Sequence, residues 1–177
     1  MTDPIADRLA TARAIATAAG DMAQTYFAAF DSLTIQKKGH QDLVSEADRN
    51  VETLVRARIA AAFPDDAVIG EEQAVTPGSS GFAWVIDPID GTANFVRGIP
   101  AWCVVLAVVR DGQTVAGVIH DPLHGETCHA IAGRGAFCND APHRGGTGCA
   151  DHPWRHRPGV FRPLRSRGDP ARGGGHP

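Results

Sequence analysis

The chain has 177 residues, of which 43% are hydrophobic, and its formal net charge is −3; this is enough apolar sequence for one domain with its own core. Its longest apolar run, residues 101–109, is too short to cross a bilayer, and the start of the chain lacks the hydrophobic segment of a secretory signal. The four cysteines include no Cys-x-x-Cys pair, so we expect reduced cysteines, a cytoplasmic protein and no membrane partner.

The first predicted element is a long amphipathic helix. Asp3 can cap its start, and Pro4 suits the first helical position, where no backbone donor is needed. Gly20 interrupts the apolar pattern, and we expect it to be tolerated there. The apolar positions recur at steps of three and four residues: Ile5, Leu9, Ala12, Ile15, Ala19, Met22, Tyr26 and Phe30.

A second helix is predicted over about residues 46–63, where apolar residues recur at helical spacing until Pro64. The segment at its start, Ser45-Glu46-Ala47-Asp48, resembles a capping box. On that interpretation Asp48 stabilises the start of the helix. The alternative is that this polar segment is a loop that covers a functional site.

Strand-like segments follow the second helix. They are short, rich in β-branched residues, and separated by turn residues. They lie near residues 67–69, 82–87, 102–109, 114–120 and 126–132. This order predicts an α+β fold in which two helices pack on a largely antiparallel sheet, with Trp84 and Trp102 serving sheet packing.

Two carboxylates follow the apolar run 82–86. Pro88 has no backbone N–H and a fixed φ, so we expect the strand to stop there. Asp87, Asp90 and the carbonyl of Ile89 would then point into one small volume. Carboxylates crowded this closely repel each other unless a divalent cation offsets their charge, and oxygen ligands of this kind favour Mg2+.

The residues after these carboxylates suit an anion. Gly91 allows the backbone to approach a phosphate closely, and Thr92 would begin a helix whose free N–H groups can hold it. Asp121-Pro122 provides an internal contrast, because it lacks a second carboxylate and a Gly-Thr pair. We expect that dipeptide to be an ordinary turn.

These motifs resemble the inositol monophosphatase family. The strongest likeness is carried by residues 70–72, Gly-Glu-Glu, followed by residues 87–95, Asp-Pro-Ile-Asp-Gly-Thr-Ala-Asn-Phe. Lys37 with residues 42–48 resembles a further motif of the family, with a serine where threonine is usual. Residues 133–142 resemble its Gly-x-Gly-Ala-x-x-Asn-x-x-Pro segment. The resemblance implies the N-terminal domain of the inositol monophosphatase and sugar phosphatase fold.

The resemblance also assigns roles to individual residues. It implies two or three Mg2+ ions with these ligands: Glu71, Asp87, the Ile89 carbonyl and Asp90. Gly91 and Thr92 would hold the substrate phosphate. Glu71 and Thr92 would position the attacking water. Asp48 would lie near a further metal position, and Lys37 would lie close to the reacting phosphate.

The implied activity is hydrolysis of a small phosphate monoester, in the first place an inositol phosphate, by in-line attack of metal-activated water. Such a reaction depends on placement and electrostatics and needs no protein nucleophile. Similar motifs occur in histidinol-phosphate phosphatases and in 3'(2'),5'-bisphosphate nucleotidases, so these activities are alternatives. Homodimers are common in the family.

The chain changes character near His143, where the resemblance stops. Residues 1–142 carry 10 basic and 18 acidic residues, whereas the remaining 35 residues carry seven and two and are rich in glycine, proline and arginine. We therefore expect a domain over residues 1–143 and a tail over residues 144–177 that is disordered or read out of frame.

The family also places a metal-binding aspartate in a later Trp-Asp motif, and no tryptophan of this chain precedes an aspartate. The chain is therefore predicted to be a weakly active or inactive phosphatase. Two non-enzyme alternatives are a partner-binding remnant of the fold and a nucleic-acid binder that uses the basic tail. The tail lacks a recognition helix, an aromatic RNA-binding segment and zinc-ligand spacing, which argues against nucleic acid.

Overall fold

The computed structural model describes residues 3–32 and 39–143, and within them only the backbone of residues 30–32 and 39–45. Its helices and strands are α1 (Pro4–Ser32), α2 (Gly39–Ala62), β1 (Ala67–Ile69), β2 (Phe82–Asp90), α3 (Thr92–Phe95), β3 (Cys103–Arg110), β4 (Gln113–Asp121), β5 (Glu126–Ile131), β6 (Ala136–Cys138) and β7 (Ala141–His143). Lys37, Cys149 and the predicted tail lie outside the described residues.

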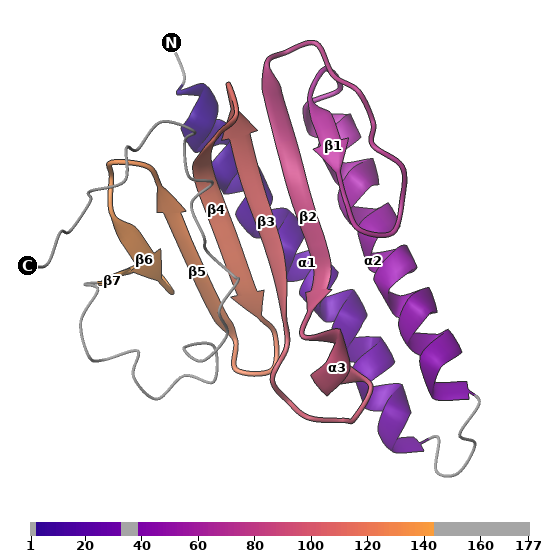
Figure 1. The fold of residues 1–177 in the computed structure, drawn as a ribbon. Helices are drawn as coiled ribbons and strands as arrows, with labels where there is room; N and C mark the ends of the chain where they lie inside the picture. Colours follow the sequence, from indigo (N-terminus) through magenta and orange to yellow (C-terminus); the bar gives the residue numbers. More distant parts are fainter. Residues whose placement is uncertain (1–2, 33–38, 144–177) are drawn as a thin grey trace, which may run out of the picture.

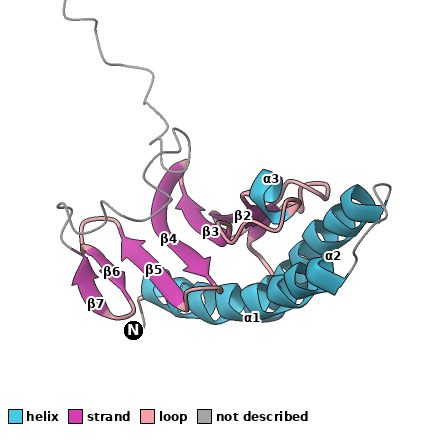
Figure 2. Cartoon of the chain, turned by 90° about the horizontal axis from the view of Figure 1, so that it is seen from below, coloured by secondary structure: helices cyan, strands magenta, loops and turns pink. Residues whose placement is uncertain are grey.

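One sheet holds all seven strands of the described residues, in the same order as along the chain. β1 is parallel to β2, and each later strand is antiparallel to the one before it. α1 and α2 lie side by side on one face of this sheet (Figure 1), and the view in Figure 2 shows the helices and the sheet as two layers. The predicted α+β fold is confirmed.

α1 begins as predicted at Pro4. Asp3 caps it, because its Oδ1 accepts the backbone N–H of Ile5 at 3.0 Å. Gly20 is more than a tolerated interruption: a Cβ there would lie 2.5 Å from the His120 ring of β4, so the glycine lets α1 approach the sheet closely. The most buried residues of α1 are Ala12, Ile15, Ala16, Ala19 and Ala23.

α2 begins at Gly39, well before the predicted start at residue 46. The capping-box interpretation of residues 45–48 is therefore wrong, and so is the loop alternative, since Asp48 lies inside the helix. The error has a physical cause. The segment 39–45 opens with glycine and is mainly polar, so helix propensity and apolar periodicity both argue against a helix there.

β2 continues through Pro88 to Asp90, so the prediction that the strand stops at Pro88 is wrong. The register with β3 shifts in this stretch, because Asp87 is opposite Val105 whereas Asp90 is opposite Cys103. A bulge therefore accommodates the proline, which could not donate to the ladder of a regular strand.

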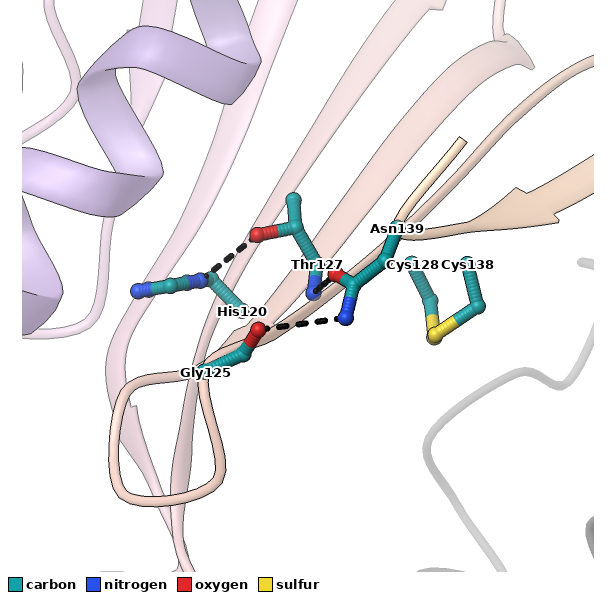
Figure 3. The surroundings of a disulfide bond; sticks show 6 residues. All are labelled: His120, Gly125, Thr127, Cys128, Cys138 and Asn139. Atoms are coloured by element: carbon teal, nitrogen blue, oxygen red, sulfur yellow. Dashed lines mark hydrogen bonds between the residues drawn. A yellow bond between two sulfur atoms is a disulfide. The ribbon is translucent and has the colours of Figure 1, made fainter. Parts of the chain in front are cut away.

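Cys128 and Cys138 form a disulfide between β5 and β6 (Figure 3), which contradicts the expectation that these cysteines are reduced. The two residues are direct partners in the strand register, and their Cα atoms are 4.1 Å apart. Asn139 stabilises the same corner: its Oδ1 accepts the N–H of Thr127 at 2.9 Å, and its Nδ2 donates to the carbonyl of Gly125 at 3.2 Å. The sequence carries no signal for the pair, because only the register brings the two thiols together.

The core lies between the sheet and the two long helices. Trp84 and Trp102 are fully buried in it, as the packing interpretation predicted. Trp102 packs against the rings of Phe27 and Phe95 at centroid distances of 5.5 and 4.9 Å.

Among the described residues, none of the helices has the length and apolar character that a membrane span requires.

Candidate metal and phosphate site

The predicted site residues that the structure describes belong to several elements, and α3 begins directly after the end of β2 (Figure 1). Asp48 lies in α2 and Glu71 follows β1. Asp87 and Asp90 belong to the last part of β2, and Thr92 opens α3 as predicted. Three of these carboxylates act electrostatically on that of Asp87. The fold thus brings together acidic side chains that are far apart in the sequence.

Asp87 is half-buried at the bulge of β2. Burial is the largest cause of a rise in the pKa of its carboxyl to about 7. Neighbouring carboxylates add to the rise, in the order Glu71, Asp90 and Asp48, while a hydrogen bond with the backbone of Ile89 opposes it. Within the described part of the chain, every charged group that shifts the pKa of this carboxyl is acidic.

Asp48 is 7% exposed and belongs to the buried side of α2. Burial raises the pKa of its carboxyl to about 7, and the charges of Glu72, Glu71 and Glu52 add to the rise. Asp48 and Asp87 therefore place like charges in a poorly solvated region. Such a cluster costs free energy unless a proton or a cation offsets part of its charge.

The donor chemistry of this cluster fits a hard divalent cation such as Mg2+, because carboxylate and carbonyl oxygens are its preferred ligands. The acidic surroundings of Asp48 and Asp87 support that fit. The side chains are not arranged as a complete set of ligands. In the described part of the chain, no group of three or more His, Cys, Asp or Glu side chains could hold a metal ion. The ligands would have to draw together around the ion.

The backbone turns sharply between β2 and α3. Gly91 has a φ of 106°, and a Cβ on it would lie 2.9 Å from the carbonyl oxygen of Ala101, so the turn requires glycine. Thr92 Oγ1 donates to the carbonyl of Ile89 at 3.0 Å. Asn94 Nδ2 donates to the carbonyl of Ala101 at 2.7 Å. These bonds fix the turn that carries the predicted phosphate-binding residues.

Two side chains of this region were missed by sequence reasoning. Glu52 is fully buried, and its Oε2 accepts the backbone N–H of Glu72 at 2.8 Å. Cys103 is also buried, with its Sγ 3.9 Å from Asp90 Oδ2. For Glu52 a signal existed: it follows Asp48 at i,i+4, a spacing that places both residues on one face of a helix.

Two further sequence predictions concern Lys37 and the dipeptide Asp121-Pro122. Lys37 lies outside the described residues, so its position near the phosphate stays a prediction. Asp121-Pro122 is an ordinary turn, as predicted. Asp121 Oδ1 accepts the backbone N–H groups of Leu123 and His124 at 3.0 and 3.1 Å.

Known proteins resemble this chain over the same region. A family model described as the inositol monophosphatase family matches residues 5–152. A histidinol-phosphatase of Chlorobaculum parvum is 43% identical over 128 residues, which cover 72% of this chain and 49% of the relative. An inositol-1-monophosphatase of Mesorhizobium japonicum is 41% identical over 115 residues, which cover 64% of this chain and 43% of the relative.

Solved structures share the fold. The extragenic suppressor protein suhB from Bartonella henselae has a TM-score of 0.68 and 32% identity, and the match covers 77% of this chain and 53% of that chain. The inositol monophosphatase from Anabaena has a TM-score of 0.67 and 31% identity, over 80% of this chain and 50% of that chain. The chain spans about half the length of the curated relatives it matches. Because the family model covers both the acidic cluster and the turn at Gly91, we conclude that this chain belongs to the inositol monophosphatase family.

Proposed function

We propose that this chain carries the metal-binding and phosphate-binding residues of a Mg2+-dependent phosphomonoesterase. The observation that carries the proposal is a pair of aspartates, the buried Asp48 and the half-buried Asp87, whose pKa values are both raised to about 7 by burial and by acidic neighbours. An acidic cluster of this kind suits a site that binds a cation. The family to which the chain belongs consists of metal-dependent phosphatases.

The proposal keeps the role that the sequence predicts for each of these residues. The proposed ligands of two Mg2+ ions are Glu71, Asp87, the Ile89 carbonyl and Asp90. Asp48 lies beside a third, weaker position. Gly91 and Thr92 bind the phosphate, Thr92 and Glu71 orient the attacking water, and Lys37 lies near the reacting phosphate. The bound cations would lower the pKa of water and stabilise the leaving oxygen.

The substrate is proposed from the relatives. An inositol monophosphate is the first candidate, because relatives from Mesorhizobium japonicum and Rhizobium meliloti are named inositol-1-monophosphatases. Histidinol phosphate is the second, because relatives from Chlorobaculum parvum, Mycobacterium tuberculosis and Streptomyces coelicolor are named histidinol-phosphatases. Both compounds are small phosphate monoesters. A 3'(2'),5'-bisphosphate nucleotide is a third substrate to assay.

The test is release of inorganic phosphate from inositol 1-phosphate and from histidinol phosphate, each with Mg2+ and with EDTA. We expect slow release that requires Mg2+ and is lost in Asp90→Asn. The rate should be low because no tryptophan of the chain precedes an aspartate, the motif that supplies a further ligand in the family. Release that persists in EDTA, or in the variant, would contradict the proposed site.

A homodimer and a cytoplasmic location remain predictions. Light scattering after gel filtration tests the first, and fractionation of cells that express the full gene tests the second. If neither substrate is hydrolysed and Asp90→Asn leaves every measured property unchanged, the partner-binding remnant becomes the better interpretation.

A further inference from the structure

Glu52 of α2 is a carboxylate with no place in the proposed chemistry, yet it is fully buried. Its Oε2 accepts the backbone N–H of Glu72 at 2.8 Å, and its Oε1 accepts Arg56 Nε at 2.7 Å. A carboxylate hydrogen-bonded at both oxygens has a well-defined position. One of these bonds fixes the residue that directly follows Glu71.

The residue before Glu71 is held against the same carboxylate. Gly70 lies so close to Glu52 that a Cβ added to it would stand 2.3 Å from Oε1. Only a residue without a side chain can approach a buried group in this way. Glu52 therefore contacts both neighbours of Glu71 in the chain, the glycine through packing and Glu72 through a hydrogen bond.

The helix face around Glu52 holds the rest of this loop. Arg56 Nη1 donates to Thr76 Oγ1 at 3.1 Å, and Arg56 Nη2 donates to the carbonyl of Gln73 at 3.2 Å. Gln73 Nε2 donates to Thr53 Oγ1 at 2.9 Å. The loop that presents Glu71 is thus bound to α2 at several points, and α2 also carries Asp48.

We propose that Glu52 is a positioning residue, which holds the segment 70–73 so that Glu71 stays beside Asp48 and Asp87. The role rests on the proposed function, since it matters for catalysis only if Glu71 is a metal ligand. The competing explanation is that Glu52 and Arg56 form an i,i+4 ion pair that only stabilises α2. The two explanations differ in what happens at the loop when Glu52 loses its charge.

The first experiment compares the whole chain with its Glu52→Gln variant by NMR-detected amide exchange. Replacing a charged acceptor with a neutral one weakens the bond to the Glu72 N–H, so we expect that amide to exchange about tenfold faster. The amides of Leu106 and Val118, which pair in the centre of the sheet, should keep their rates. Glu46→Gln, the same change at an exposed position of α2, is the matched control and should alter none of them.

The second measurement is the affinity for Mg2+ by titration calorimetry, with no substrate present. Groups that orient a metal ligand typically contribute 10- to 100-fold to metal affinity. We therefore expect Glu52→Gln to weaken Mg2+ binding at least about tenfold, and Glu46→Gln to leave it unchanged. Gly70→Ala provides a second perturbation of the same contact without a change of charge, and it should weaken binding in the same direction.

The outcomes separate the two proposals. If the unmodified chain binds Mg2+ and both Glu52→Gln and Gly70→Ala bind it equally well, Glu52 does not position the ligand, although the proposed function survives. If the unmodified chain binds no Mg2+, the proposed function fails, and the exchange rate of the Glu72 amide alone decides whether Glu52 holds the loop. An unchanged rate at that amide in Glu52→Gln would overturn the positioning role. Should Glu52→Gln fail to fold, Gly70→Ala carries both measurements.

Discussion

The two ends of β2 differ in how their surroundings shift the pKa of an aspartate: the buried Asp66 lies beside the start of the strand, and the half-buried Asp87 belongs to its last part. At the start of the strand, Arg8 donates to both oxygens of Asp66 at 2.7 and 2.8 Å, and Trp84 Nε1 donates at 2.8 Å. Burial would raise the pKa of Asp66, but these bonds and one from Ser80 hold it below its ordinary value. At the far end, burial and acidic neighbours raise the pKa of Asp87 to about 7.

Burial therefore does not by itself decide the direction in which a carboxyl pKa shifts; the charge of the neighbouring groups decides it. The guanidinium of Arg8 also lies over the rings of Phe63 and Phe82, 4.4 and 3.7 Å from their centroids. The ion pair of Arg8 and Asp66 is neutral overall, and both of its charged groups find their partner within the chain. Among the described residues, the charged neighbours of Asp87 are acidic, a balance of charge that a bound cation would offset.

The largest expected effect is on stability at the Arg8 end of the strand. Asp66→Asn should lower the free energy of unfolding by about 3 kcal/mol, because it leaves the Arg8 charge buried without its carboxylate. Urea denaturation measures the loss. Affinity for Mg2+, determined at a temperature where the variant is folded, should stay the same. A loss below about 1 kcal/mol is the size expected of an exposed pair. It would contradict the claim that the pair of Arg8 and Asp66 stabilises the fold.

The next effect is on the site at the other end. Asp90→Asn should reduce Mg2+-dependent phosphate release by more than about 100-fold, since loss of a direct ligand should exceed the loss typical of residues that only orient one. The free energy of unfolding should change by less than about 1 kcal/mol. Parallel measurement of phosphate release and urea denaturation checks both. If stability falls as far as it does in Asp66→Asn, Asp90 is a structural residue.

A smaller effect is expected when the same change, aspartate to asparagine, is made at Asp87, at the opposite end of β2. In EDTA, Asp87→Asn should leave the free energy of unfolding unchanged or raise it by about 1 kcal/mol, because it removes one charge from a cluster of like charges. Urea denaturation of both variants under one set of conditions provides the comparison. Destabilisation of Asp87→Asn by more than about 2 kcal/mol would show that the acidic cluster is not under repulsion.

The smallest expected effect is the response to acid. Asp66 has a folded-state pKa below its ordinary value of 3.8, so the folded state binds fewer protons there than the unfolded state. Its contribution to stability is present above pH 3.8 and is lost as the pH falls through the folded-state pKa. Chemical denaturation at pH 5 and at lower pH measures the free energy of unfolding, which should decline more steeply with falling pH in the unmodified chain than in Asp66→Asn. Equal declines in the two proteins would contradict a lowered pKa of Asp66 in the folded state.

Much of the molecule follows from short stretches of sequence. Apolar periodicity predicts α1 and five of the strands, and the residue types from Asp87 to Thr92 predict a cation and phosphate site before any coordinates are known. The predictions of the helix and the strands are confirmed, because each depends on local chemistry, whereas the cation and phosphate site stays a prediction. A cap such as Asp3, a glycine at a positive φ such as Gly91, or adjacent carboxylates have the same meaning wherever the chain folds.

Three features depend on the tertiary structure. The partner of Glu52 is a loop amide, β2 passes through Pro88 by means of a bulge, and Cys128 meets Cys138 across two strands. In each case the deciding contact joins residues on different elements. Periodicity in a sequence reveals which face of an element is buried, but the charge, donor or thiol that lies opposite is set only when the sheet register and the helix packing are formed.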